Sequence, residues 1–406
     1  MSASAAPALA DPRPRRERAA AASGPPREAE RPVTVAISGG GTGGHIFSAL
    51  AIADALSEAL PSVDILFVGA AGGPEVDAVR AAGYRLETVP IAGIARGLAP
   101  RALLSNLLLP ARLVASALEA RRIVDERRPD LAIGVGGYAS APLVAEAQRR
   151  RIPTLVHEQN AVPGIANRIL ARQASVVCLG MEEARRCFDR RRAVVTGNPI
   201  RRDLRSPPGP ARVARLGLSP GVRTLLVLGG SLGSATLNRF VLENQRALAA
   251  RAQVLWSCGR EAHPECARRL GEDARARIRL VPFQDDMAAA YSAADLVISG
   301  AGALSIAELA HLGKPAIVVP SPDVAEDHQA RNAAALARRG AAVRIRSDRA
   351  RERLLGAALD LIDDERRRRE LADRLRSLSR HDANERIVRE ALRFVPAARR
   401  PSRPPP

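Results

Sequence analysis

Aromatic residues are scarce in this 406-residue chain, which has one tryptophan, three tyrosines and six phenylalanines. Any core must therefore be built mainly from aliphatic side chains, and these are plentiful, since hydrophobic residues make up 46% of the sequence. Lysine is scarcer still, because Lys314 is the only one among 62 lysines and arginines. The formal net charge of +19 rests on arginine, yet no basic stripe with interleaved aromatic residues marks a nucleic-acid site. We expect no nucleic-acid partner and a general preference for anionic surfaces and substrates.

Cysteines are few, and their spacing matches neither a zinc nor a redox motif, so we expect free thiols in a reducing compartment. No apolar run approaches the ~20 residues that cross a bilayer, and residues 1–32 lack the apolar segment of a signal peptide. That stretch is rich in Pro, Ala, Arg and Glu without periodicity, which predicts a disordered N-terminal extension. No metal is expected, because His157 lacks a spaced partner ligand.

Short apolar strands alternate with alanine-rich helical stretches along most of the chain, a pattern that predicts parallel sheets covered on both faces. The first seven strand candidates are 33–38, 64–68, 85–90, 131–135, 154–157, 175–178 and 193–196. Six more follow at 223–228, 253–257, 278–281, 296–299, 316–319 and 342–345. Glycine and proline clusters in residues 197–221 indicate a linker between two doubly wound units.

A glycine loop, Ile-Ser-Gly-Gly-Gly-Thr-Gly-Gly-His at residues 37–45, joins the first strand candidate to a helical stretch. This arrangement aims backbone N–H groups and a positive helix end at an anion, usually a phosphate, and a Cβ would hold that ligand away. The loop matches G-x-G-x-x-G, but a dinucleotide site would need an acidic residue where Gly69 and Ala70 end the second strand. NAD is therefore disfavoured. A similar turn at 229–234 implies a ligand in the cleft between the two units.

Several polar residues stand where such a ligand would bind. His45 lies in the first turn of its helix, where the dipole should keep the ring neutral and able to accept a proton, unless the histidine only caps or packs. The run His157-Glu158-Gln159-Asn160 ends the fifth strand and suits hydrogen bonding to a sugar or peptide, or forms a polar turn.

Two acidic positions carry different expectations. Glu308 lies on the helix after the 299–303 glycine turn, where its carboxylate could accept hydrogen bonds from both ribose hydroxyls of a nucleotide. Asp285-Asp286 is expected to be the N-cap and first turn of a short helix rather than a metal site. The segment 327–332 again offers amides for binding a sugar.

Seven motifs occur in one order, and together they carry a resemblance that covers roughly residues 33–395. They are Gly40-Gly-Thr-Gly-Gly-His45, Gly136-Gly-Tyr138, His157-Glu-Gln-Asn160, Gly197-Asn-Pro199, Gly229-Gly-Ser231, Gly302-Ala-Leu304 with Glu308, and Asp327-His-Gln329. This set closely resembles the MurG family of bacterial N-acetylglucosaminyltransferases, in glycosyltransferase family 28. The resemblance implies an α/β GT-B fold, with two Rossmann-like doubly wound domains facing a central cleft.

That likeness also implies a division of the chain. Residues 33–200 would form the acceptor and membrane domain, and residues 201–379 the domain that binds UDP-GlcNAc. A C-terminal helix at about 380–398 would pack back on the first domain, and residues 399–406 would be a disordered tail.

The implied reaction is the inverting transfer of GlcNAc from UDP-GlcNAc to the C4 hydroxyl of MurNAc in undecaprenyl-pyrophosphoryl-MurNAc-pentapeptide (lipid I), giving lipid II. No catalytic metal or cofactor is implied, and His45 is the candidate base. The positions that match substrate-binding residues of the family are Thr42, Gly43, Gly44, Asn160, Arg201, Ser231, Gln284, Ala303, Leu304, Ser305, Ile306, Ala307, Glu308 and Gln329. Another GT-B UDP-sugar transferase with a lipid acceptor, or a non-catalytic nucleotide-sugar-binding protein, stays open as an alternative.

Three positions depart from the family pattern. Family members usually carry proline where Ser48 stands, often arginine where Gly300 stands, and in some a second glutamine where Ala330 stands. The missing arginine leaves the donor site less positive, so donor affinity is the property most affected.

Residues 91–118 are unusually apolar, with Ile94, Leu98, Leu103, Leu104, Leu107 and Leu108 interrupted by arginines and a proline. Leucines beside arginines are typical of a segment that enters the headgroup boundary of anionic lipid. The alternative is an ordinary helix that buries its leucines against the sheet. The family resemblance favours peripheral attachment to the cytoplasmic face of the inner membrane. It also implies that proteins of cell-wall synthesis are partners.

Overall fold

The computed structural model describes residues 31–41, 43–60, 62–73, 75–93, 106–230, 233–322 and 327–395. Apart from residues 31 and 32, the expected N-terminal extension lies outside the described residues, as does the expected tail. Two predicted site residues, Thr42 and Ser231, also lie outside them, and so do residues 94–105 of the apolar segment.

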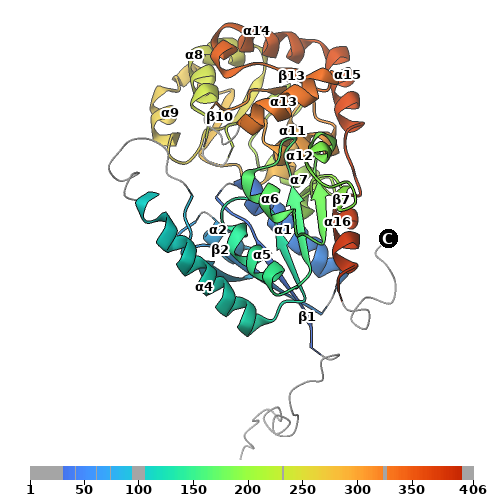
Figure 1. Ribbon diagram of the computed structural model, residues 1–406. Coiled ribbons are helices and arrows are strands. Elements are labelled where there is room, and N and C mark those ends of the chain that lie inside the picture. Colours follow the sequence, from blue (N-terminus) through green and yellow to red (C-terminus); the bar gives the residue numbers. More distant parts are fainter. Residues whose placement is uncertain are drawn as a thin grey trace, which may run out of the picture. The chain divides into compact units, whose positions relative to one another are not determined.

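The first sheet has seven parallel strands in the order β3-β2-β1-β4-β5-β6-β7 (Figure 1). Their bounds are β1 Val33–Ser38, β2 Val63–Ala70, β3 Arg85–Val89, β4 Leu131–Gly134, β5 Thr154–Glu158, β6 Val176–Leu179 and β7 Ala193–Val195. The helices between them are α1 Gly43–Ala59, α2 Glu75–Ala81, α4 Leu109–Arg127, α5 Ser140–Arg149 and α6 Ile165–Leu170, with a 3₁₀ turn, η1, at Glu182–Cys187. All seven strand candidates of this unit are confirmed to within two residues.

The second sheet has six parallel strands in the order β10-β9-β8-β11-β12-β13. Their bounds are β8 Thr224–Leu228, β9 Gln253–Ser257, β10 Ile278–Val281, β11 Leu296–Ser299, β12 Ala316–Val318 and β13 Val343–Arg344. Its helices include α7 Pro210–Ala214, α8 Ala235–Arg251, α9 His263–Arg269, α10 Glu272–Arg275, α11 Met287–Ala293, α12 Ala303–Leu312, α13 His328–Arg338, α14 Ala350–Asp363 and α15 Glu365–Arg376. Two 3₁₀ turns, η2 Arg202–Leu204 and η4 Ser347–Arg349, complete the unit.

Strand β1 shows why a run of β-branched residues forms the centre of a covered sheet. All six of its residues are buried. Successive side chains of a strand point to opposite faces, so Val35 and Ile37 pack in the core beneath α1 while Ala36 packs in the core on the opposite face. Helices therefore cover both faces, as the alternation predicted.

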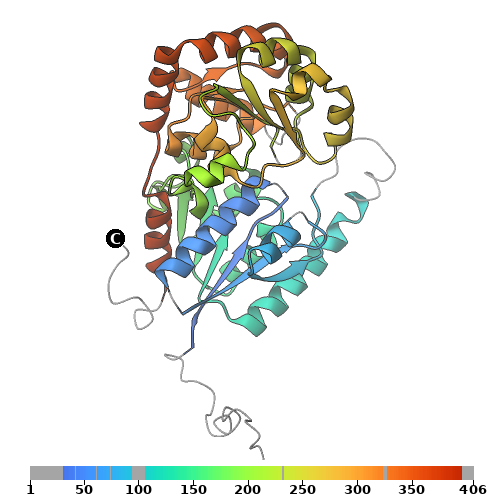
Figure 2. The ribbon, with the colours of Figure 1, turned by 180° about the vertical axis from the view of Figure 1, so that it is seen from behind.

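The last helix, α16 Ala383–Leu392, returns from the second unit and lies beside α1 (Figures 1 and 2). Its Ile387 and Val388 belong to the same buried cluster as Ile52 and Leu56 of α1. The side chain of Asn384 accepts a hydrogen bond from the Ile200 N–H at 2.8 Å and thus fixes the chain between the units.

Helix α11 begins with a polar cap, as expected from its sequence. Asp286 is the N-cap of α11 and accepts a hydrogen bond from the Ala289 N–H at 2.9 Å, so the helix-cap interpretation of the Asp285-Asp286 pair is confirmed.

The four cysteines are free thiols. Within the described ranges, no helix is long and apolar enough to cross a membrane.

Candidate active site

His45 lies in the first turn of α1, directly after the glycine loop that follows β1. Its Nδ1 lies 3.0 Å from the carbonyl oxygen of Gly40. Because a carbonyl oxygen only accepts hydrogen bonds, the neutral ring carries its proton on Nδ1 and its lone pair on Nε2. Nε2 is therefore the atom through which His45 can accept a proton.

The pKa of His45 is lowered from 6.5 to about 4, chiefly because burial disfavours the charged ring. The hydrogen bond to Gly40 opposes this shift, and the nearby His328 adds to it. The ring is neutral at pH 7, as predicted. Burial, and not the helix dipole that we invoked from the sequence, is the main cause.

A glycine pair after β4 makes room for the His45 ring. Gly136 and Gly137 have φ values of +94° and +76°. A Cβ on Gly136 would lie 3.1 Å from His45 Nε2, and one on Gly137 would lie 2.1 Å from the carbonyl oxygen of Gly40. The Gly-Gly-Tyr motif therefore allows the ring and the glycine loop to approach this turn closely, which a larger residue would prevent.

Most of the His157–Asn160 segment points into its own domain. His157 Nε2 donates to the carbonyl oxygen of Gly197 at 3.3 Å, and Gln159 Nε2 donates to that of Val135 at 2.7 Å. Burial lowers the pKa of His157 to about 4, so this ring is neutral as well. These two side chains hold the strand end and its neighbouring loops together.

Glu158 shapes the loop that follows. Its carboxylate accepts hydrogen bonds from the N–H groups of Asn160 at 2.9 Å and Gly164 at 3.2 Å, and from Asn167 Nδ2 at 2.8 Å. Burial raises the pKa of Glu158, although these bonds oppose the shift. Of the two interpretations given above for this run, the polar turn is correct for its first three residues, and only Asn160 reaches the other domain.

An amide cluster joins the two domains beside that loop. Asn332 of α13 is fully buried, and its Oδ1 accepts a hydrogen bond from the Ala161 N–H at 2.9 Å. Its Nδ2 donates to Asn160 Oδ1 at 3.1 Å and to the carbonyl oxygen of Ala301 at 3.2 Å. Asn198 adds a further link, because its Nδ2 donates to the Gln159 carbonyl of the first domain at 3.0 Å and to the Ala303 carbonyl of the second at 3.5 Å. The amide of Asn332 thus holds the domains together rather than standing open to a sugar.

Gln329 organises the loops on the second sheet. Its Oε1 accepts hydrogen bonds from the Ala301 N–H at 3.1 Å and the Ser321 N–H at 2.9 Å. A Cβ on Gly300 would lie 3.1 Å from this oxygen. The glycine that replaces the usual arginine therefore leaves room for the amide that connects the two loops.

Glu308 is buried on α12 between two partners. Its Oε2 accepts a hydrogen bond from the hydroxyl of Tyr291 at 2.9 Å, and its Oε1 lies 3.1 Å from Arg201 Nε in an ion pair. Burial raises the pKa of Glu308, whereas the charge of Arg201 lowers it. The Arg201 guanidinium also lies 5.4 Å from the centre of the Phe47 ring of α1. One arginine therefore connects the first helix of the first domain with a carboxylate of the second.

The remaining predicted residues fall into two groups. Gly43 and Gly44 begin α1, and Ala303 begins α12, so all three present backbone N–H groups at a helix start. Along α12, the buried Leu304 and Ile306 pack inward, while Ser305 and Ala307 are partly exposed. Gln284 donates to the carbonyl oxygen of Asp286 at 2.8 Å, and no hydrogen bond among the described residues joins it to the rest of the site.

Sequence reasoning missed three contributors to this region, Glu75, Asn167 and Tyr291. None lies in a motif that signals chemistry, and each acts through a contact with a residue 9 to 34 positions away in the chain. The only available signal was a glutamate directly after Gly72-Gly73-Pro74, at the start of a helix. Across the residues that the structure describes, no group of three His, Cys, Asp or Glu side chains could hold a metal ion.

Comparison with known proteins agrees with this architecture. Residues 35–178 match the glycosyltransferase family 28 N-terminal domain, and residues 224–387 match its C-terminal domain. The UDP-N-acetylglucosamine--N-acetylmuramyl-(pentapeptide) pyrophosphoryl-undecaprenol N-acetylglucosamine transferase of Cytophaga hutchinsonii is 42% identical over 369 residues, covering 90% of this chain and 98% of that relative. The protein of the same name from Parabacteroides distasonis is 41% identical over 368 residues, covering 90% and 99%.

The crystal structure of MurG from Acinetobacter baumannii is similar with a TM-score of 0.68 and 29% sequence identity, covering 89% of this chain and 100% of the other. Together with two parallel sheets flanked by helices, this similarity confirms the predicted GT-B fold of two Rossmann-like domains. The chain therefore belongs to glycosyltransferase family 28 and, within it, to the MurG family of N-acetylglucosaminyltransferases.

Proposed function

We propose that this enzyme transfers GlcNAc from UDP-GlcNAc to the C4 hydroxyl of MurNAc in lipid I, giving lipid II, with His45 as the general base. The observation that supports His45 most directly is its neutral ring, with Nδ1 donating to Gly40 and the lone pair on Nε2. Nε2 accepts the hydroxyl proton while the acceptor oxygen forms a bond to the sugar C1 and the bond from C1 to the UDP oxygen breaks. Attack from the face opposite UDP inverts the anomeric centre.

The charge that develops on UDP needs cationic and N–H groups near the donor. We assign this task to Arg201 and to the N–H groups at the start of α12. Arg201 is suited to it because its Nε lies 3.1 Å from Oε1 of the buried Glu308, which holds the guanidinium at the second domain. Glu308, Gln284 and Gln329 complete the proposed donor side, together with Ser231.

The division of labour follows from these positions. Residues 33–200 take the lipid-linked acceptor, with its diphosphate near the glycine loop, and residues 201–379 take UDP-GlcNAc, to whose binding Thr42, Gly43 and Gly44 also contribute. Asn332 donates to both Asn160 and the Ala301 carbonyl, so hydrogen bonds join the loop after β5 to the loop after β11.

The test is UDP release from UDP-GlcNAc measured with and without lipid I. Release that depends on lipid I, with GlcNAc recovered on the lipid, is the expected result. Binding of UDP-GlcNAc without any release in the presence of lipid I would overturn the proposal in favour of a non-catalytic sugar-nucleotide binder. Release without lipid I, or with another lipid acceptor only, would indicate a different transferase.

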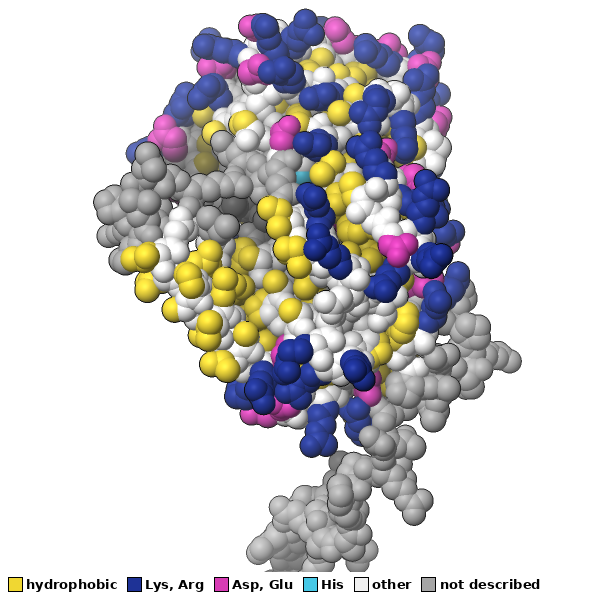
Figure 3. Space-filling model, in the orientation of Figure 1, with side chains coloured by type: hydrophobic (Ala, Val, Ile, Leu, Met, Phe, Trp, Pro, Cys, Tyr) yellow, Lys and Arg dark blue, Asp and Glu magenta, His cyan; other side chains and the backbone are white. Residues whose placement is uncertain are grey.

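Helix α4 carries an apolar surface that suits a membrane. Leu107 and Leu108, directly before its first residue, are 76% and 44% exposed, so the alternative of leucines buried against the sheet is wrong for these two residues. Farther along the helix, Leu113, Val114 and Leu118 are also exposed. Figure 3 shows hydrophobic side chains gathered over α4, where arginines lie close by.

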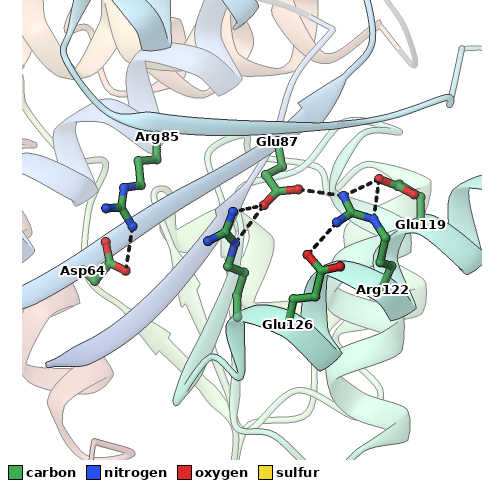
Figure 4. Close-up of polar contacts among 7 residues, drawn as sticks. Asp64, Arg85, Glu87, Glu119, Arg122 and Glu126 are labelled. Carbon is green, nitrogen blue, oxygen red and sulfur yellow. Dashed lines mark hydrogen bonds and ion pairs between the residues drawn. The ribbon is translucent and has the colours of Figure 1, made fainter. Parts of the chain in front are cut away.

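The buried side of α4, with Ala120, Ile123 and Val124, packs on the first domain, and ion pairs join the C-terminal half of the helix to β3. Arg122 pairs with Glu119 and Glu126 of its own helix and reaches Glu87 of β3 at 2.9 Å, and Arg127 pairs with the same Glu87 (Figure 4). The helix is thus held with its apolar side outward. We propose that this side enters the headgroup region of an anionic membrane at the cytoplasmic face, where a lipid-linked acceptor would be presented.

Paired charge substitutions test this attachment. Val114→Glu with Leu118→Glu should reduce binding to vesicles containing anionic lipid while leaving UDP-GlcNAc binding unchanged. Arg366→Gln with Arg369→Gln on α15 is the matched control, because it lowers the net charge equally without touching α4. Equal vesicle binding by both folded variants would rule out α4 as the attachment surface.

A further inference from the structure

A buried carboxylate lies beneath the glycine loop of the first domain. Glu75, the first residue of α2, is 1% exposed. Three glycines surround its side chain. A Cβ added to Gly40 would lie 2.1 Å from Glu75 Oε1, one added to Gly73 would lie 2.5 Å from Oε2, and one added to Gly69 would lie 2.8 Å from Cγ. A side chain at any of these positions would displace the carboxylate, so the loop and the acid fit as one unit.

Its hydrogen-bond partners are backbone N–H groups. Glu75 Oε1 accepts from the Ala70 N–H at 2.8 Å, and Oε2 accepts from the Gly41 N–H at 3.4 Å. The first-turn N–H groups of α2 also favour a negative charge at this position. Two backbone N–H groups therefore hold the Glu75 carboxylate against the loop that precedes α1.

The Gly40–Gly41 peptide group joins this carboxylate to His45. Its N–H, on Gly41, donates to Glu75, and its carbonyl oxygen, on Gly40, accepts from His45 Nδ1 at 3.0 Å. The two hydrogen bonds therefore lie at opposite ends of one planar, conjugated unit. A carboxylate at the N–H end polarises the unit and makes the carbonyl oxygen a stronger acceptor.

That polarisation acts on both properties that a general base needs. A stronger acceptor at Gly40 favours the tautomer with the proton on Nδ1. It also stabilises the imidazolium more than the neutral ring, because a charged donor forms the stronger hydrogen bond. We propose that Glu75 is a positioning residue for His45, which through the Gly40–Gly41 peptide group fixes the ring tautomer and raises the proton affinity of Nε2. The inference rests on the proposed role of His45.

Other titratable groups near the ring set the background for this effect. His328 of α13 lowers the pKa of His45 electrostatically. Tyr138, whose ring lies 2.8 Å from where a Gly41 Cβ would be, has a pKa raised by burial and by the charge of Glu75. The charge of Glu75 therefore acts on Tyr138, whose ring lies beside the glycine loop.

The test compares Glu75→Gln with the matched control Glu146→Gln. Glu146 is 9% exposed and pairs with Arg149 and Arg150. The primary readout is the ¹⁵N spectrum of the histidine ring at pH 7, assigned through His45→Gln. Unsubstituted protein and control should show His45 with its proton on Nδ1. Glu75→Gln should show a measurable share of the other tautomer, because its amide cannot accept at both positions.

Kinetics give a second readout. Glu75→Gln should lower kcat by about threefold to tenfold, the effect of a base weakened by about half to one pKa unit, without changing the KM for UDP-GlcNAc. If Glu75→Gln does not fold, Glu75→Asp is the second variant. Its shorter side chain retains the carboxylate but moves it away from the Gly41 N–H, so it should shift the His45 tautomer in the same direction. An unchanged tautomer in a folded Glu75 variant would overturn the inference. Full activity of His45→Gln would instead overturn the proposed base, whatever the spectra show.

Discussion

Replacing Asn332 with alanine should be among the most destabilising single changes near the active site. The Asn332 amide forms three hydrogen bonds, one to Ala161 at 2.9 Å, one to Asn160 at 3.1 Å and one to Ala301 at 3.2 Å. The first two partners follow β5 of the first sheet, and Ala301 follows β11 of the second. One side chain therefore makes three of the polar contacts around the loops where the two domains meet.

The magnitude follows from the burial of these groups. Each hydrogen bond contributes about 1 kcal/mol net, and a buried group left without its partner costs about 1–3 kcal/mol. Ala161 is 3% exposed and Ala301 is fully buried, so water cannot replace the lost amide. Alanine is the better helix former by about 0.5 kcal/mol, which offsets a small part of the loss. We expect Asn332→Ala to lower the free energy of unfolding by about 3 kcal/mol.

Urea unfolding, followed by near-UV circular dichroism, measures this loss. Asn244→Ala in α8 is the matched control, because its Nδ2 donates at 2.8 Å only to the Phe240 carbonyl one turn earlier in the same helix. The control should change stability by less than about 0.5 kcal/mol. If Asn332→Ala is no more destabilised than Asn244→Ala, the amide cluster does not hold the domains together.

Three further changes test the site itself. His45→Ala should lower turnover about 100-fold with little change in UDP-GlcNAc binding, and more than about a tenth of the original turnover would contradict a general base. Glu308→Gln should weaken binding of UDP more than binding of its 2′,3′-dideoxyribose analogue. Equal losses would mean that Glu308 acts only through Arg201 and Tyr291. For His157, whose pKa falls from 6.5 unfolded to about 4 folded, the folded state binds fewer protons between these values. Stability should therefore drop by up to about 3 kcal/mol as pH falls from 6.5 to 4, and His157→Gln should remove that part of the drop when urea unfolding is repeated across this range.

Local patterns predicted the scaffold well because each strand and glycine turn is encoded by neighbouring residues. The thirteen strand candidates, the helix start at His45 and the Asp286 cap all depend on a few adjacent positions. The neutral state of His45 was also predicted, but its main cause was not, since burial is produced by turns far away in the chain such as Gly136–Gly137.

Long-range contacts explain what the sequence did not reveal. A polar run such as His157–Asn160 reads the same whether its side chains point inward or toward a ligand, and only the fold decides. Glu75 accepts a hydrogen bond from the N–H of Gly41, which is 34 positions away in the sequence. Asn332 accepts one from the N–H of Ala161, which is 171 positions away. No periodicity or spacing rule connects positions so far apart.

The return of α16 to the first sheet has a consequence for synthesis of the chain. Ile387 and Val388 complete a core whose other members, such as Ile52 and Leu56, leave the ribosome before the whole second sheet. Translation proceeds at about 5–20 residues per second, so the apolar side of α1 stays uncovered for many seconds while the second domain is made. The domain that is translated first is thus the last to be finished, and a chain that stops short of Ala383 leaves an open core in the half that was made first.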